Sequence, residues 1–219
     1  MKSARAAKKI GVLLVDDHPV VRDGYRHLLE KTPDILVLAD AGDGERACAL
    51  YEQIKPDVVV LDLSMPGMGG LEIIRRILSR DGAARILVFS MHDSETLILR
   101  ALRAGATGYL TKQSGMGQMV EAVREVAQGK MFILSEHLQN ILRQLAKPSD
   151  HPLQILSPRE FQLFHLLAEG HSVVEIAAIL SLSPKTVGVH HASIMKKLAL
   201  KNAAQLVRLA MDCKVIGSV

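Results

Sequence analysis

The chain has 219 residues, of which 48% are hydrophobic but only 3% aromatic, and its net charge is +4. This length exceeds a typical single domain, so we expect two domains, and the shortage of aromatic residues disfavours an aromatic ligand cage. No apolar stretch approaches the roughly eighteen residues of a membrane span, and the two isolated cysteines suggest neither a zinc site nor a disulfide framework, so we expect a cytoplasmic protein without membrane contacts.

The first part of the chain alternates short apolar runs with amphipathic stretches of helical length, which is typical of successive βα units. The sequence predicts strands near 10–15, 36–41, 58–63, 85–90 and 108–110, and helices near 19–31, 44–54, 70–80, 94–104 and 116–128. Strands that are apolar along their whole length belong to a parallel sheet covered on both faces. We therefore expect an α/β domain over residues 1–130, with a five-stranded doubly wound parallel sheet in the flavodoxin-like order 2-1-3-4-5.

Four of these apolar runs end in polar residues suited to handling a phosphoryl group. Asp16 and Asp17 follow the first strand, Asp62 the third, Ser90 the fourth and Lys112 the fifth. Ligands of such sheets bind outside the carboxyl ends of the strands, so we expect these side chains to share one crevice. Close carboxylates repel one another unless a cation lies among them, and hard oxygen ligands favour Mg²⁺. Asp62 is then a candidate nucleophile towards an activated phosphoryl group, with Lys112 and Ser90 neutralising its oxygens.

The surrounding motifs resemble a response-regulator receiver over the first 130 residues, in Val15-Asp16-Asp17-His18, Val60 through Gly67, Ser90-Met91, and Gly105 through Lys112. The resemblance implies that a sensor histidine kinase phosphorylates Asp62. It also implies that Asp17, Asp62 and the Ser64 carbonyl bind Mg²⁺ or Mn²⁺ directly, and that Asp16 acts through water.

The same resemblance implies that Ser90 and Tyr109 move together when the receiver is activated. A phosphatase of the haloacid type is an enzymatic alternative, because it also uses a strand-end aspartate as its nucleophile. That family places a second aspartate two residues later as general acid, where this chain has Ser64. We therefore expect slow self-dephosphorylation at most and no dedicated enzyme. An assay for hydrolysis of small phosphate esters with Mg²⁺ would distinguish a regulator from a phosphatase.

The alternation of strands and helices stops beyond Gly129. Ser135–Leu145 is predicted to form a further helix, and Lys147–Pro152 suits a connector because it contains two prolines and polar residues. The sequence therefore predicts a linker over 131–152 and a second domain over 153–219.

The second domain is predicted to be all helical, with four helices. Ser157 and Ser172 each begin a capping box, Ser183-Pro184 is a third helix start, and Asn202 caps a fourth. The helices near 173–180 and 184–197 are joined by a three-residue turn, the length expected in a helix-turn-helix.

The helix over 184–198 has two different faces. Its core-facing residues at helical spacing are Val187, His191, Ile194 and Leu198, which leaves Lys185, Val189, Ala192 and Lys196 on the outward side. From Ser181 onward, the basic residues Lys185, Lys196, Lys197, Lys201, Arg208 and Lys214 stand against one acid, Asp212. A small, basic helix face fits the major groove of DNA, although a solvated face of a helical bundle has the same pattern.

The motifs Leu156 through Glu160, Glu169-Gly170, Glu175-Ile176-Ala177, Ser183 through His190 and Ile194 through Leu198 resemble the LuxR-type DNA-binding domain. Together with the receiver, they make the chain similar to the NarL/FixJ family of transcriptional regulators. The resemblance implies promoter DNA as a partner, with contacts at or near Lys185, Thr186, Val187, Val189, His190 and Lys196. It also implies a homodimer after phosphorylation, RNA polymerase as a further partner, and masking of the 184–198 helix by the receiver at rest.

Two regulators with other inputs remain as alternatives. A ligand-gated LuxR-type receptor would share the carboxyl-terminal domain, but it needs an amino-terminal pocket for a small apolar signal, and the acid-lined crevice argues against one. A phosphorylation-independent DNA binder would be recognised by comparing DNA binding with and without a phosphoryl donor. Gly188 and Ala192 stand where longer polar side chains are common in the family, so we expect base readout to be sparse.

Overall fold

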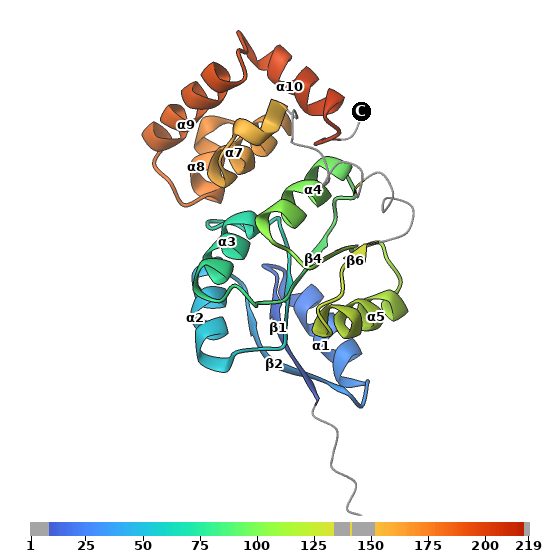
Figure 1. Ribbon diagram of the computed structural model, residues 1–219. Helices are drawn as coiled ribbons and strands as arrows, with labels where there is room; N and C mark the ends of the chain where they lie inside the picture. The colour runs from blue at the N-terminus through green and yellow to red at the C-terminus, as the bar shows by residue number, and fades with distance from the viewer. Residues whose placement is uncertain (1–8, 134–140, 142–151, 217–219) are drawn as a thin grey trace, which may run out of the picture.

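The structure is a computed structural model that describes residues 9–133, 141 and 152–216 (Figure 1). The strands are β1 (Ile10–Val15), β2 (Ile35–Ala41), β3 (Val58–Leu61), β4 (Ile86–Ser90), β5 (Gly108–Thr111) and β6 (Phe132–Ile133). The helices that alternate with them are α1 (Pro19–Glu30), α2 (Gly44–Ile54), α3 (Gly70–Arg80), α4 (Glu95–Ala104) and α5 (Met116–Ala127). The helix predicted over 135–145 and the connector predicted over 147–152 lie outside the described residues, apart from Ile141 and Pro152.

The strands form one parallel sheet in the order β2-β1-β3-β4-β5-β6. The predicted order 2-1-3-4-5 is therefore confirmed, but the predicted number of five strands is wrong. A sixth strand, β6, pairs with β5 through Gly108 opposite Phe132 and Tyr109 opposite Ile133. Only two residues long and half-buried, β6 is too short for the alternation of strands and helices to reveal it.

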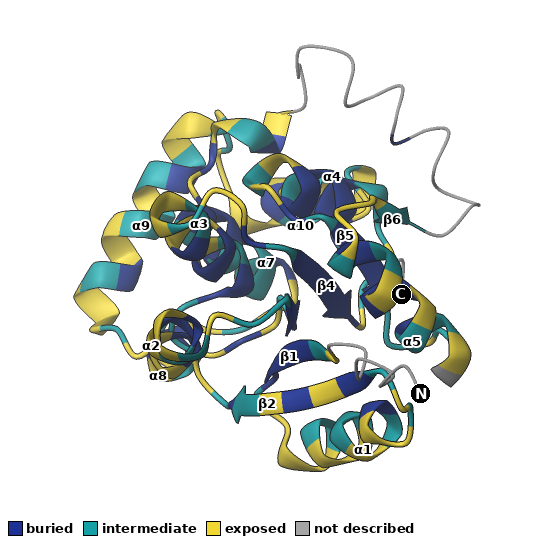
Figure 2. Cartoon of the chain, turned by 60° about the horizontal axis from the view of Figure 1, so that its bottom comes forward, coloured by how far each residue is buried: buried dark blue, intermediate teal, exposed yellow. Residues whose placement is uncertain are grey.

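Alternate residues of the central strands belong to two different apolar cores. Leu13 and Val59 pack with α2, α3 and α4, whereas Val12 and Val58 pack with α1 and α5. This division explains why β1 and β3 are apolar throughout, since both faces of the sheet are covered. Figure 2 shows the contrast between β4, which is buried along its length, and the edge strand β2, where buried and exposed residues alternate.

The helical domain comprises the 3₁₀ turn η1 (Pro152–Ile155) and helices α7 (Pro158–Ala168), α8 (Val173–Ile179), α9 (Pro184–Lys197) and α10 (Ala203–Asp212). The four predicted helices and their caps are confirmed. In α7, Ser157 Oγ accepts from Glu160 N while Glu160 Oε2 accepts from Ser157 N, and α8 begins with the same reciprocal pair. Ser183 and Asn202 cap α9 and α10.

Within the part of the chain that the structure describes, no single helix is long and apolar enough to cross a membrane. Among the described helices, α8 and α9 taken together have a suitable length and composition, but they are bent by 110° at the short turn between them.

The two domains are in contact. Helices α7 and α10 lie over α3 and α4, while α9 lies on the outer side of the helical domain (Figure 1). Leu97 of α4 belongs to the same apolar cluster as Phe161 and Leu206 of the helical domain, so the core of the helical domain extends onto α4.

Candidate functional site

Three acids from two adjacent strands meet at the carboxyl edge of the sheet. β1 and β3 are paired in register, with Val15 opposite Leu61, and Asp16, Asp17 and Asp62 follow directly. One ligand atom each from these acids and from His18 can be chosen so that all four lie within 4.8 Å of one another. Neighbouring parallel strands that end together therefore bring the predicted carboxylates into one cluster, as expected.

Lys112 joins this cluster from the end of β5. Its Nζ lies 2.5 Å from Asp16 Oδ2 and 2.7 Å from Asp62 Oδ2, and its side chain is only 8% exposed. Burial lowers the pKa of Lys112, but the two carboxylates outweigh burial and leave this pKa raised. The backbone N–H of Lys112 donates to Ser90 O at 2.7 Å, which fixes the lysine beside the end of β4. Lys112 is therefore an ammonium shared by two of the acids, and the cluster keeps a net negative charge.

The oxygen atoms of the cluster suit a divalent cation. Asp17 Oδ1 is buried and accepts no hydrogen bond, and His18 Nδ1 lies 2.9 Å from it, at ion-pairing distance. A buried, unsatisfied carboxylate oxygen is costly unless a cation or water binds it. Asp62 Oδ1, by contrast, accepts from Ser64 N at 3.1 Å. Hard anionic oxygens in this arrangement are the ligands that Mg²⁺ prefers. Sequence reasoning missed His18, although it directly follows the two aspartates.

Ser90 and Tyr109 lie on neighbouring strands beside the cluster. Ser90 is fully buried, and its hydroxyl oxygen accepts from His92 N at 3.3 Å. The Tyr109 ring points inward at 2% exposure, and its hydroxyl donates to His92 O at 2.7 Å. Burial raises the pKa of the Tyr109 hydroxyl, so it remains protonated. Both residues therefore contact the loop that leads from β4 to α4.

A cavity of about 690 Å³ separates the acid cluster from the helical domain. The receiver contributes Asp17, Ser64 and His92 to its wall, and the helical domain contributes Gln162 and His165. The His92 and His165 rings meet edge to face with their centroids 4.9 Å apart. The helical domain thus forms one side of the cavity beside Asp17.

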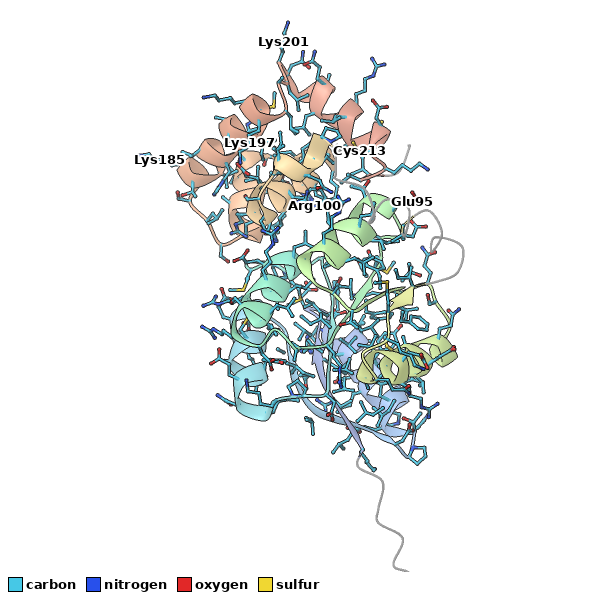
Figure 3. All side chains as sticks on the ribbon, in the orientation of Figure 1. Glu95, Arg100, Lys185, Lys197, Lys201 and Cys213 are labelled. Carbon is cyan, nitrogen blue, oxygen red and sulfur yellow. The ribbon has the colours of Figure 1, made fainter. Side chains whose placement is uncertain are left out.

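Helix α4 binds the helical domain through side chains that the sequence analysis did not identify. Arg100 donates to Leu153 O at 2.7 Å and to Leu156 O at 3.0 Å, and its guanidinium lies 3.9 Å from the Phe161 ring centroid. Burial lowers the pKa of Arg100 to about 10. Thr96 donates to Cys213 O at 2.7 Å. In Figure 3, Arg100 reaches from α4 towards α7, and Cys213 lies above α4.

The outward face of α9 is open to solvent. Lys185 and Lys196 are exposed, and Val189 is 64% exposed. Figure 3 shows Lys185 projecting away from the receiver. Thr186 and His190 are half-buried, and the Thr186 hydroxyl shares a hydrogen bond with Ser183 Oγ at 2.8 Å.

Two expectations drawn from the resemblance need correction. Val187 was expected at or near DNA, but its side chain is fully buried in the effector core, as the helical spacing predicts. Masking of α9 by the receiver was also expected, but the outward face carrying Lys185, Val189 and Lys196 is exposed. The receiver instead contacts α7, the last residue of α8 and the end of α10. Gln162 of α7 and Ile179 O of α8 bond the loop before α3, and Cys213 O accepts from Thr96 of α4.

Lys197 has a role within the domain. Its ammonium lies 2.6 Å from Glu160 Oε2, while Ser193 Oγ donates to Glu160 Oε1 at 2.7 Å. Burial alone would raise the pKa of Glu160, but Lys197, Ser193 and the Ser157 N–H lower it to about 2. The last turn of α9 is thereby fastened to the first turn of α7.

Both parts of the chain match known families. Residues 12–124 match the response regulator receiver domain, and residues 154–210 match the bacterial regulatory proteins of the luxR family.

Relatives align with nearly the full chain. The response regulator GacA of Pseudomonas aeruginosa is 36% identical over 92% of this chain and 95% of its own length. The nitrate/nitrite response regulator NarL of Escherichia coli is 36% identical over 89% of this chain and 91% of its own. The structure also resembles RcsB from Salmonella enterica bound to a promoter with the phosphomimetic BeF₃⁻, at 27% identity and a TM-score of 0.67 over 94% of this chain and 100% of that one. The chain therefore belongs to the NarL/FixJ family of two-component response regulators, in which a receiver is joined to a LuxR-type DNA-binding domain.

Proposed function

We propose that phosphorylation of Asp62 controls DNA binding by this transcription regulator. The observation that carries the proposal is the meeting of Asp16, Asp17 and Asp62 with Lys112 at the end of the central strands. Phosphoryl transfer needs an in-line nucleophile and positive charge beside the equatorial oxygens, and this cluster can supply both.

Asp17, Asp62 and the Ser64 carbonyl would hold Mg²⁺ or Mn²⁺, with Asp16 acting through water. The unsatisfied Asp17 Oδ1 supports this assignment. When bound, the ion supplies charge that stabilises the phosphoryl oxygens. A carboxylate oxygen of Asp62 attacks the phosphorus of the kinase phosphohistidine, forming the O–P bond as the N–P bond breaks and the histidine leaves. Lys112, already 2.7 Å from Asp62, can turn its ammonium to a phosphoryl oxygen.

The signal would pass through Ser90 and Tyr109. As the Ser90 hydroxyl turns to donate to the phosphoryl group, its bond with His92 N is lost, and Tyr109 can leave His92 O. Both changes act on the loop that begins α4, the helix that carries Arg100. Release of α7 and α10 from this surface frees the effector and allows two copies to dimerise on paired half-sites.

DNA would bind to the open face of α9 through Lys185, Thr186, Val189, His190 and Lys196. The promoter complex of RcsB supports DNA as the partner of this domain. We place the end of the receiver at Ile133 rather than 130, because β6 pairs with β5, and the start of the effector at Pro152 rather than 153, because η1 begins there. We further propose that the protein acts in the cytoplasm, contacts RNA polymerase at promoters, and dephosphorylates itself slowly.

The direct test is phosphotransfer from the cognate kinase, or from a small acyl phosphate, to full-length Asp62→Asn in the presence of Mg²⁺. We expect no labelling of this variant. Asp43→Asn is a matched control, because Asp43 accepts from Arg46 N at the start of α2 and asparagine can replace it as a cap. Continued labelling of Asp62→Asn would remove Asp62 from its role. DNA binding is then compared with and without the phosphoryl donor at several salt concentrations, because phosphate contacts make affinity salt-dependent.

A further inference from the structure

The loop between β3 and α3, residues 62–69, belongs to the acid cluster at one end and to the domain interface at the other. At its start, Ser64 N donates to Asp62 Oδ1 at 3.1 Å. Further along, Gln162 Nε2 of α7 donates to Met65 O at 3.1 Å, and Gly67 N donates to Ile179 O at 3.0 Å. The same short piece of backbone is therefore bound by the phosphoacceptor and by the effector domain.

The effector side of this contact is itself fixed. Arg159 donates to Gly67 O, to Gln162 Oε1 at 2.8 Å and to Leu180 O at 2.7 Å. Both ends of the Gln162 amide are consequently used, one by Arg159 and the other by Met65 O. This orients the amide, so that its N–H₂ group points at the loop.

The loop fits closely against Gln162. A Cβ atom added at Gly69 would lie 2.8 Å from Gln162 Cδ, which is too short for a normal contact. The absence of a side chain at Gly69 therefore lets the loop approach α7. Gln162 of the effector domain thus donates a hydrogen bond to Met65 O and also packs against Gly69.

Both carboxylate oxygens of Asp62 are already bonded within the protein. Oδ1 accepts from Ser64 N and Oδ2 accepts from Lys112 Nζ. Each of these oxygens can accept one more bond, so a cation and a phosphoryl group must share Asp62 with the donors already there or displace them. Because successive Cα atoms are held about 3.8 Å apart, Ser64 cannot shift far while Met65 and Gly67 are held by the effector.

We propose that Gln162 and Arg159 are positioning residues of the phosphoacceptor site, which hold the 62–69 loop against Asp62 and so lower its affinity for Mg²⁺ and the phosphoryl group. This inference rests on the proposed function of Asp62. Coupling between sites is reciprocal, so contacts that oppose phosphorylation are themselves weakened by it. Effector docking and phosphorylation then compete through this loop, by a route separate from Ser90 and Tyr109.

The test is calorimetric titration of the full-length protein with beryllofluoride and Mg²⁺. Gln162→Glu keeps the size of the side chain and the acceptor for Arg159 but removes the donor to Met65 O. Gly69→Ala disturbs the same contact from the receiver side. We expect each to raise the affinity about three- to tenfold, or about 0.7 to 1.4 kcal/mol. Gln205→Ala is the control, because this exposed glutamine lies on α10 and its side chain contacts Lys201 N.

Thermal unfolding confirms that each variant is folded before titration, and a purely structural role would lower stability without raising ion affinity. If both Gln162→Glu and Gly69→Ala bind beryllofluoride and Mg²⁺ no more tightly than the wild type does, the proposal is overturned. The role of Asp62 would remain intact, because the wild-type protein still binds. Binding that persists in Asp62→Asn would instead overturn the proposed function and this inference together.

Discussion

Lys112 Nζ lies 2.7 Å from Asp62 Oδ2, and the two side chains are 8% and 3% exposed. The same ammonium reaches Asp16, so one buried cation is shared by two buried anions. Removing one partner of a buried ion pair leaves an uncompensated charge, which costs far more than breaking a pair in solvent.

Lys112→Met should lower the free energy of unfolding by about 3 kcal/mol, because Asp16 and Asp62 lose their cation. Added Mg²⁺ should recover part of this loss, since the ion can replace the missing charge. Thermal unfolding with and without Mg²⁺ measures both effects. Lys130→Met is the control: Lys130 is 57% exposed and paired with Glu125, so its loss should cost less than about 1 kcal/mol. Equal stability of the two variants would contradict the prediction.

Glu160→Gln should destabilise the effector domain by about 2 kcal/mol near neutral pH, because charge-assisted bonds from Lys197, Ser193 and Ser157 are lost. The pKa of Glu160 is lowered to about 2, so its contribution is complete above the ordinary value near 4.5 and declines as pH falls towards 2. The difference between variant and wild type in denaturant unfolding should therefore shrink below about pH 4.5. Glu175→Gln, at the exposed capping box of α8, should have a smaller effect.

The contact between His92 and His165 should make domain docking sensitive to pH. Burial and the neighbouring His165 lower the pKa of His92, against the opposing influence of Glu169, Asp62 and Asp93. A histidine whose pKa is lowered by docking favours the docked state while the pH is above the ordinary histidine pKa of about 6.5. As the pH falls below that value, protonation of the histidine opposes docking. We expect the radius of gyration, measured by X-ray scattering, to rise between about pH 7.5 and 5.5.

His92→Gln removes this titration and should flatten the scattering profile over the same range. His190→Gln, on α9 away from the receiver, should leave the profile of the wild type. A profile that is unchanged by His92→Gln would show that the histidine pair does not control docking.

Lys185→Ala and Lys196→Ala should each weaken DNA binding by a similar factor for all sequences. Loss of one phosphate contact lowers the slope of log affinity against log salt concentration by about 0.9. Fluorescence anisotropy at several salt concentrations gives this slope. Lys55→Ala, on the receiver, should leave it unchanged. If Lys185→Ala alters discrimination between sequences but not the slope, this lysine reads a base edge.

The receiver site could be predicted from sequence because its chemistry follows from strand order. Apolar runs place Asp16, Asp62, Ser90 and Lys112 at strand ends, and parallel strands bring such ends to one edge. The helix caps were equally predictable, because each is a local pattern of a few residues.

The domain interface could not be predicted in this way. The interface donors Thr96, Arg100, Arg159 and Gln162 bind backbone carbonyls across the interface, which every residue possesses. The side-chain contacts across the interface, Arg100 with Phe161 and His92 with His165, join residue types whose pairing no sequence pattern marks. Val187 illustrates the opposite case, since helical spacing correctly assigned it to the core while family likeness placed it near DNA.

The exposed face of α9 bears on how such a regulator finds its promoters. Because Lys185 and Lys196 already face solvent while the domains are docked, an unmodified molecule can meet the chromosome through long-range attraction to phosphates. Phosphorylation then adds little to the rate at which the protein encounters DNA. In the proposed mechanism, phosphorylation would instead lengthen the time spent on DNA, because a dimer would bind two half-sites at once.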